Sequence, residues 1–256
     1  MNAAAAWSRD LDAWAIPSEI LTQASESPWI HPPVLFDVPD VIVDSPSHQR
    51  ACEVLGESAT VLDVGCGGGI AAFALTPPAT HVIGVDHQRE MLEMFEHNAR
   101  ARGVGVETYL GFWPALAAEV PIAQVATAHH VVYNVGDIVP FLRAMNEHAT
   151  RRVVLEMPQR HPLASLSSAW RHFWQLERPT APSPTDLVAV LAEMGIDASM
   201  EFWNGPMRIE HDLAQAAHFT RVRLCLPEER EDEVLEFLEA NPPASQRELA
   251  TLWWDV

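Results

Sequence analysis

Residues 61–70 read VLDVGCGGGI, and this stretch decides the fold of the chain. Its first four residues, VLDV, are apolar and rich in β-branched side chains, which is typical of a strand buried on both faces of a parallel sheet. Gly65, Gly67 and Gly69 then permit a tight turn with positive φ, and they remove the Cβ atoms that would keep the backbone from a ligand. A helix beginning near Gly69 would present free N–H groups to that ligand. The stretch therefore predicts a pocket for a nucleotide-type ligand.

A second strand ending in a carboxylate supports this interpretation. Residues 81–86 read HVIGVD, and a helix over residues 88–101 follows. If this strand pairs with the first, Asp86 lies beside the glycine turn, where a carboxylate can accept both ribose hydroxyls of an adenosine. Dinucleotide sites place a further small residue where this chain has Ile70, so a nicotinamide oxidoreductase is disfavoured.

The spacing D-x-G-x-G-x-G resembles motif I of the class I S-adenosylmethionine-dependent methyltransferases. The resemblance extends over residues 51–156 and 248–256. It implies an α/β fold with a doubly wound, seven-stranded, mostly parallel sheet, S-adenosyl-L-methionine as methyl donor and S-adenosyl-L-homocysteine as product. The cofactor-binding residues that it implies are Asp63, Gly65, Cys66, Gly67, Gly69, Asp86, His87, Gly111, Phe112, Trp113 and His129.

Residues 111–113 read Gly-Phe-Trp, where this family often has Gly-Asp-Ala or Gly-Asp-Trp. In the family the acid binds the adenine amino group. Because Phe112 replaces it, we expect adenine to be held by backbone groups and by stacking on Phe112 or Trp113.

The chain length of 256 residues fits one methyltransferase domain. We divide it into an N-terminal lead-in (1–45) with a short helix at 18–24, a cofactor-binding half (46–158) and a substrate half (159–256). Prolines argue against any long helix in the lead-in. The segment Trp29-Ile30-His31 could cover the cofactor. In the simpler interpretation, Trp29 and Phe36 pack on the sheet. A helical insertion at 206–243 is typical of a lid or of a contact in a homodimer.

Further elements follow from periodicity and from turn residues. We expect strands at 105–110, 123–127, 152–157 and 198–203, and a last strand at 249–254 that runs antiparallel at the sheet edge. Helices are expected at 45–55, 137–148, 165–176, 185–194, 212–224 and 228–240. Trp170, Phe173 and Trp174 form an aromatic stripe that indicates core packing, or else a wall against the acceptor.

Composition excludes several classes of function. The formal net charge of −19 argues against nucleic acid as a partner, because phosphate binding requires clustered cations. There is neither a long apolar run nor a secretory signal, so we expect a cytoplasmic protein without a membrane partner. All 16 cationic residues are Arg, and the absence of Lys excludes Schiff-base chemistry. Cys52, Cys66 and Cys225 lack the spacing of a metal site.

The string AHHVVYNVGD at residues 128–137 follows the fourth predicted strand. Ligands of doubly wound sheets lie beyond the carboxyl ends of the strands, so His129 and His130 should face the transferred methyl group. Histidine is the natural general base near neutral pH. We identify His130, His129 and Tyr133 as catalytic candidates. In the alternative interpretation one histidine braces the loop. Tyr133 and Asn134 either orient the acceptor or cap the next helix. The string loosely resembles one found in actinobacterial small-molecule or sugar methyltransferases.

A divalent ion such as Mg²⁺ is an alternative to a histidine base. Asp137, Glu156 and His161 are the candidate ligands, since they follow neighbouring strands and some sugar and catechol methyltransferases use such an ion to acidify a hydroxyl.

The resulting expectation is S-adenosylmethionine-dependent O-methylation of a small molecule or saccharide. Alternatives are N- or C-methylation of a small metabolite, an arsenite-like acceptor, which the scattered cysteines disfavour, and a methyltransferase-like binding protein without activity.

Overall fold

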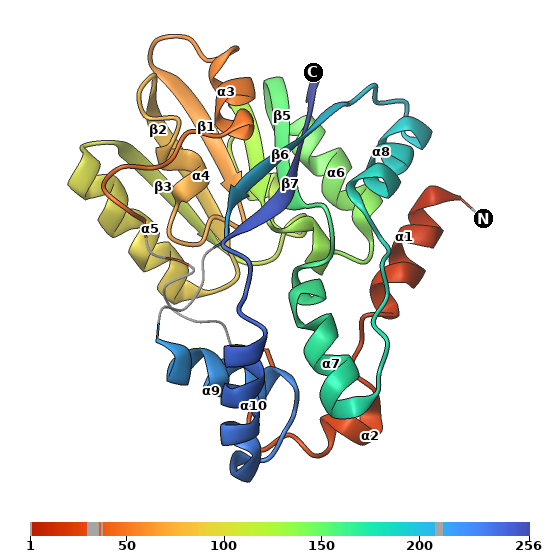
Figure 1. Cartoon of the computed structure of the whole chain (residues 1–256). Helices are drawn as coiled ribbons and strands as arrows, with labels where there is room; N and C mark the ends of the chain where they lie inside the picture. Colours follow the sequence, from red (N-terminus) through yellow and green to blue (C-terminus); the bar gives the residue numbers. More distant parts are fainter. Residues whose placement is uncertain (1, 30–35, 37, 208–211) are drawn as a thin grey trace.

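A single seven-stranded sheet organises the molecule. The computed structural model describes residues 2–29, 36, 38–207 and 212–256. The strands lie in the order β3-β2-β1-β4-β5-β7-β6 (Figure 1). Six of them run in the same direction, and β7 is antiparallel to both of its neighbours, which confirms the predicted doubly wound sheet. The strands are β1 Ala59–Val64, β2 Ala79–Asp86, β3 Gly105–Leu110, β4 Ala123–His129, β5 Ala149–Pro158, β6 Ser199–Pro206 and β7 Gln246–Asp255.

Helices cover both faces of the sheet because successive residues of each buried strand point to opposite sides. In β1, Leu62 belongs to the core cluster that includes Phe141 of α6, whereas Val61 belongs to the cluster that includes Ala51 of α3. One face is covered by α1 Ala3–Asp12, α6 Ile138–Glu147 and α8 Pro184–Glu193, and the other by α3 Pro46–Cys52, α4 Ile70–Phe73 and α5 Arg89–Arg102.

The position of β7 corrects one prediction. The last strand is antiparallel as expected, but it lies between β5 and β6 rather than at the edge, which β6 occupies. Glu156 of β5 is thereby paired with Thr251 of β7, and Thr251 is paired with Glu201 of β6. The residues of β7 are consequently buried from Leu249 to Leu252.

The lead-in contains a ten-residue helix, α1, that the proline count did not predict. The side chain of Asn2 caps this helix by accepting from Ala5 N–H, and four consecutive alanines follow it. Trp7 of α1 is fully buried, and its Nε1 donates to the carbonyl of Val135 at 2.9 Å. The first helix of the lead-in is therefore part of the main core, whereas Ile16 and Ile20 pack in a separate cluster.

A group of four helices, here called the helical cap, gathers at the end of the sheet where the parallel strands terminate (Figure 1). Its members are α2 Ser18–Leu21, α7 Ser167–Trp174, α9 Leu213–Arg223 and α10 Glu231–Ala240. Trp170 packs in a core of its own that is separate from the sheet, with Phe173 and Trp174 beside it, as the packing interpretation of the aromatic stripe predicts. Arg221 is buried there and forms ion pairs with Glu26 and Glu231 at 2.6 and 2.8 Å.

The remaining short elements are 3-10 turns: η2 Ala117–Glu119, η3 Val132–Asn134, η4 Pro162–Leu166 and η5 Glu228–Arg230. Among the described residues, no helix has the length and apolar character that a membrane span requires.

Candidate active site

The glycine turn after β1 has the conformation that its sequence predicts. Gly65, Gly67 and Gly69 have φ values of 70°, 51° and 99°, a region that side-chain-bearing residues rarely adopt. The backbone N–H groups of Gly65 and Cys66 donate to the carbonyl of Val85 on β2, at 2.7 and 3.1 Å. These bonds hold the turn against the carboxyl ends of β1 and β2.

Asp86 lies against this turn, as expected for a ribose ligand. One carboxylate oxygen accepts from Gly67 N–H at 3.1 Å and the other from Gln88 N–H at 2.9 Å. Each oxygen retains a second lone pair. The carboxylate is thus fixed in place and still able to accept from two hydroxyl groups.

Asp63 and Cys66 support the turn from below. Asp63 is buried and accepts from Ala72 N–H in the first turn of α4 at 3.2 Å, and burial raises the pKa of its carboxyl to about 7. Cys66 is also buried, and it packs with Phe95 of α5. Its thiol points into a hydrophobic cluster, so its contribution to a ligand would come from the backbone.

The two aromatic residues predicted to stack on adenine have different surroundings. Trp113 is turned into the protein, where its Nε1 donates to the carbonyl of Phe141 at 3.3 Å and its ring meets His148 edge to face. Phe112 is 69% exposed and is stacked on His87, with ring centroids 5.0 Å apart. Because His87 directly follows Asp86, Phe112 is the aromatic residue available to an adenine at this site.

Part of the lead-in lies over the glycine turn. A Cβ added at Gly68 would come within 2.1 Å of the carbonyl oxygen of Phe36, and one added at Gly67 would lie 3.4 Å from the Phe36 ring. Trp29, by contrast, is 56% exposed and does not pack on the sheet. The predicted cofactor cover also included Ile30 and His31, which lie outside the described residues.

The two candidate histidines lie where β4 ends. His129 is the last residue of β4 and is paired with Glu156 of β5. His130 follows with a positive φ of 63°, and its N–H donates to the carbonyl of Glu156 at 2.7 Å. The next residue packs against the glycine turn, because a Cβ at Gly65 would lie 2.6 Å from Val131 Cγ2. The histidines therefore adjoin the glycine turn, as the strand order predicts.

Glu156 is the charged centre of this cluster. Its Oε1 lies 3.2 Å from His130 Nε2 and 3.9 Å from His129 Nδ1, and its Oε2 accepts from Ser45 Oγ at 3.5 Å. Although burial opposes ionisation, the neighbouring imidazoles hold the pKa of the Glu156 carboxyl below its usual range. Burial lowers the pKa of His129 to about 4. At neutral pH we therefore assign a carboxylate to Glu156 and an uncharged ring to His129.

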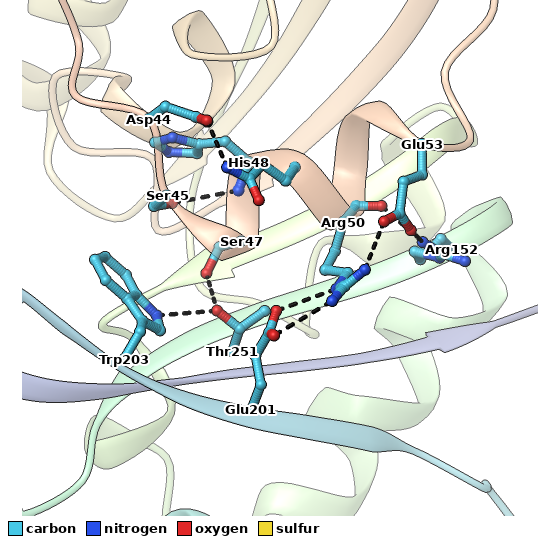
Figure 2. A network of polar contacts seen from close by, with 11 residues as sticks. Asp44, Ser45, Ser47, His48, Arg50, Glu53, Arg152, Glu201, Trp203 and Thr251 are labelled. Carbon is cyan, nitrogen blue, oxygen red and sulfur yellow. Dashed lines mark hydrogen bonds and ion pairs between the residues drawn. The ribbon is translucent and has the colours of Figure 1, made fainter.

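The amino end of α3 completes the cluster with residues that the sequence analysis missed. Figure 2 shows Ser47 joined to Thr251, which also accepts from Trp203 Nε1, while Ser45 caps the helix by accepting from His48 N–H. The His48 ring stacks on His129 with centroids 5.7 Å apart. The helix expected at residues 45–55 begins here, but the side on which α3 packs depends on tertiary contacts.

The other end of α3 is anchored by ion pairs. Arg50 contacts Glu53 and Glu201, and Arg152 contacts Glu53 (Figure 2). These pairs tie α3 to β5 and β6 and hold its first turn beside the histidines.

Tyr133 is a packing residue rather than one that faces an acceptor. It is buried, donates to the carbonyl of Pro158 at 2.9 Å and stacks on Trp7. Asn134 lies in η3, and the caps described for α6 include no side-chain bond from it.

The three predicted metal ligands do not meet in one site. Glu156 serves the histidine cluster, Asp137 precedes α6, and His161 stacks on Trp14 while its Nδ1 accepts from Leu163 N–H. Within the part of the chain that the structure describes, no group of three or more His, Cys, Asp or Glu side chains is arranged to hold a metal ion. The structure thus gives no support to a Mg²⁺ site at these residues.

Comparison with protein families identifies one match. Residues 61–151 match the family described as a methyltransferase domain, which spans β1 to the start of β5 and contains both the glycine turn and the histidines. The chain is thus similar to this family over about a third of its length. No curated protein matches the chain significantly.

Solved structures share the fold at low sequence identity. The YcgJ protein from Bacillus subtilis is 19% identical, with a TM-score of 0.56 over 82% of this chain and 97% of that one. A putative methyltransferase from Bacillus halodurans is 15% identical, with a TM-score of 0.56 over 81% of this chain and 96% of that one. A SAM-dependent methyltransferase from Archaeoglobus fulgidus is 17% identical, with a TM-score of 0.50 over 81% and 90%. At these identities the likeness establishes the Rossmann-like methyltransferase fold.

Proposed function

We propose that this chain is an S-adenosylmethionine-dependent methyltransferase that methylates a hydroxyl group of a small molecule or saccharide, with His130 as general base. The matched methyltransferase domain and the fold support methyl transfer. The hydroxyl acceptor and the role of His130 rest on the geometry of the histidine cluster.

The residues around the glycine turn fit S-adenosylmethionine. Asp86 has free lone pairs for the ribose hydroxyls, Phe112 offers an exposed ring for the adenine, and the positive-φ glycines bring backbone N–H groups close to a ligand. Bound there, the cofactor would supply an electrophilic methyl group on a sulfonium centre.

The position of His130 is the observation that supports a hydroxyl acceptor. Its side chain is 37% exposed, it adjoins the glycine turn through Val131, and a buried carboxylate holds its ring. A hydroxyl is a poor nucleophile until its proton is removed, and a positioned imidazole is suited to that removal near neutral pH. The acceptor oxygen would give its proton to His130 as its bond to the methyl carbon forms and the carbon–sulfur bond breaks.

The net charge of the chain further limits the chemical class of the acceptor. With a net charge of −19, the protein repels polyanions, which disfavours nucleic acid and favours uncharged or cationic acceptors.

Calorimetry with S-adenosylhomocysteine tests the cofactor half of the proposal. We expect a dissociation constant in the micromolar range or tighter, about −8 kcal/mol, and no comparable binding of NAD. Asp86→Asn should weaken binding roughly tenfold or more, since bonds to a charged acceptor contribute about 1.5–3 kcal/mol. Asp232→Asn, on the exposed surface of α10, is the matched control and should bind as wild type does. Binding of NAD in place of S-adenosylhomocysteine would overturn the proposal.

Transfer of an isotope-labelled methyl group to pooled saccharides, phenols and other hydroxylated metabolites tests the second half. Mass spectrometry of the product should locate the label on oxygen. Label on nitrogen or carbon would show that the acceptor group is not a hydroxyl. Cofactor binding without transfer to any pool would instead favour a binding protein without activity.

A further inference from the structure

We propose that Glu156 is the positioning residue for His130: it accepts from Nε2–H, fixes that tautomer of the neutral ring, and thereby makes Nδ1 the atom that takes the acceptor's proton. This inference rests on the proposed function in treating His130 as the base. It adds a defined role for Glu156 and a defined atom for the proton.

The first support is that His130 is attached to Glu156 at two points. Its backbone N–H donates to the carbonyl of Glu156 at 2.7 Å, and its Nε2 lies 3.2 Å from the carboxylate of the same residue. His130 has a positive φ of 63°, a backbone conformation that costs energy for a residue with a side chain. In this conformation His130 makes both contacts with Glu156. The direction of the ring therefore depends on β5 as well as on its own loop.

The second support is the surroundings of the carboxylate. Glu156 is 6% exposed, and it lies between His129, which is uncharged at neutral pH, and the hydroxyl of Ser45. A buried carboxylate needs donors, and an N–H donated to an ionised acceptor forms one of the stronger hydrogen bonds in proteins. His130 Nε2–H is a donor at suitable range.

The third support is the opposite nitrogen of the ring. His130 Nδ1 is shielded from solvent and has no hydrogen-bond partner among the described residues. A buried polar atom without a partner is costly, and a catalytic role is one of the reasons for which native proteins retain one. With the proton on Nε2, Nδ1 carries the lone pair that an acceptor hydroxyl requires.

Arg247 provides the competing arrangement. Its Nη2 lies 3.3 Å from the same Nε2. A donor from Arg247 would require a lone pair on Nε2 and a proton on Nδ1, which would leave the carboxylate of Glu156 facing a lone pair at 3.2 Å. Like partial charges at that distance repel, so we assign the Nε2 proton to the contact with Glu156. In this tautomer the guanidinium lies beside the ring without donating to Nε2.

Nitrogen NMR of the full chain labelled with ¹⁵N-histidine tests this without any acceptor. Long-range ¹H–¹⁵N correlations distinguish the two neutral tautomers, and loss of signals in His130→Gln assigns this ring among the 12 histidines. Wild type should show Nε2 protonated and Nδ1 unprotonated at neutral pH. Glu156→Gln should convert this single tautomer into a mixture. A wild-type ring protonated on Nδ1, or a tautomer unchanged in Glu156→Gln, would overturn the proposal.

Two further variants separate positioning from general damage to the fold. Glu201→Gln disturbs the neighbouring ion pair with Arg50 but does not touch His130, and its tautomer should match wild type. Arg247→Gln removes the competing donor, and the Nε2 tautomer should persist; its loss would show that Arg247 sets the proton. This second result keeps the proposal testable if Glu156→Gln does not fold.

Activity provides the last measurement once an acceptor has been found. Glu156→Gln should lower kcat by roughly 10- to 100-fold, a part of the 10²–10⁴ that a positioned base contributes, with the KM for S-adenosylmethionine unchanged. An unchanged kcat would contradict the proposal. If no transfer occurs in wild type, the proposed function fails, while the tautomer measurement still decides the relation between Glu156 and His130.

Discussion

The glycine turn after β1 and the histidine loop after β4 lie side by side at the same end of the sheet, yet they are built in different ways. The turn uses backbone groups and positive-φ glycines, all within residues 65–69. The loop uses side chains, and its partners come from α3, β5 and β7, far away in the sequence. A turn built from backbone groups is thus specified within a few residues, whereas a cluster built from side chains draws on elements far apart in the chain.

The strongest way to break the turn is to add a side chain to it. Gly67→Val places a β-branched residue at φ 51° and fills space beside the Phe36 ring, so we expect loss of measurable S-adenosylhomocysteine binding by calorimetry. Gly56→Ala is the matched control, because a Cβ there meets nothing within 4 Å. Normal binding by Gly67→Val would show that the ligand does not use this turn.

Substitution of His130 in the loop after β4 should leave the glycine turn intact. His130→Gln should reduce turnover by about 10²-fold, the lower end of the effect of losing a general base, with cofactor affinity near wild type. His129→Gln, measured in parallel, reports the contribution of loop bracing. Equal turnover in wild type and both variants would indicate a mechanism in which proximity alone drives transfer.

The two regions should also differ in their response to acid. The folded-state pKa of His129 lies at about 4, below its ordinary value of 6.5, so the unfolded chain binds more protons between these limits. Stability from this group is present above pH 6.5 and is lost as the pH falls toward 4, by about 2 kcal/mol at pH 5. Urea unfolding at pH 7 and pH 5 measures this loss, and His129→Gln should reduce it.

For Asp63, beneath the glycine turn, the stability contribution changes with pH in the opposite direction. Its folded-state pKa of about 7 exceeds its ordinary value of 3.8, so its contribution to stability falls as the pH rises between the two values. Asp63→Asn should therefore steepen the acid sensitivity measured by the same unfolding series. A variant with an unchanged pH dependence would contradict a raised pKa of Asp63 in the folded chain.

The smallest effect should come from the rim of the turn. Phe112→Ala removes the exposed ring beside His87 and should weaken S-adenosylhomocysteine binding roughly three- to tenfold, as expected for the loss of one aromatic stacking contact. Phe202→Ala, another exposed aromatic residue on the edge strand β6, is the control. If both variants bind as wild type does, adenine is held by other groups.

The sequence was sufficient to predict those parts of the fold and site whose physical causes lie within a few residues. The strand at residues 61–64, the turn glycines and Asp86 follow from patterns within a few residues of one another, and the structure places them together. The helix α1 was also predictable, since Asn2 precedes a run of alanines and the first proline of the chain is Pro17. The neighbours of Glu156 were not predictable, because they depend on which strand β7 joins and on which side of α3 faces the sheet.

The insertion of β7 has a consequence for the order in which the molecule is made. On the ribosome, β5 and β6 emerge well before residues 246–255, and β6 has no place in the sheet until β7 arrives to pair with both. Until then, the flank of Glu156 that β7 covers faces water, and Ser47 lacks its contact with Thr251. Long-range pairing of this kind is slow to form. The residues that surround the glycine turn, by contrast, are all translated before β7, so the turn should form before the surroundings of Glu156 are complete.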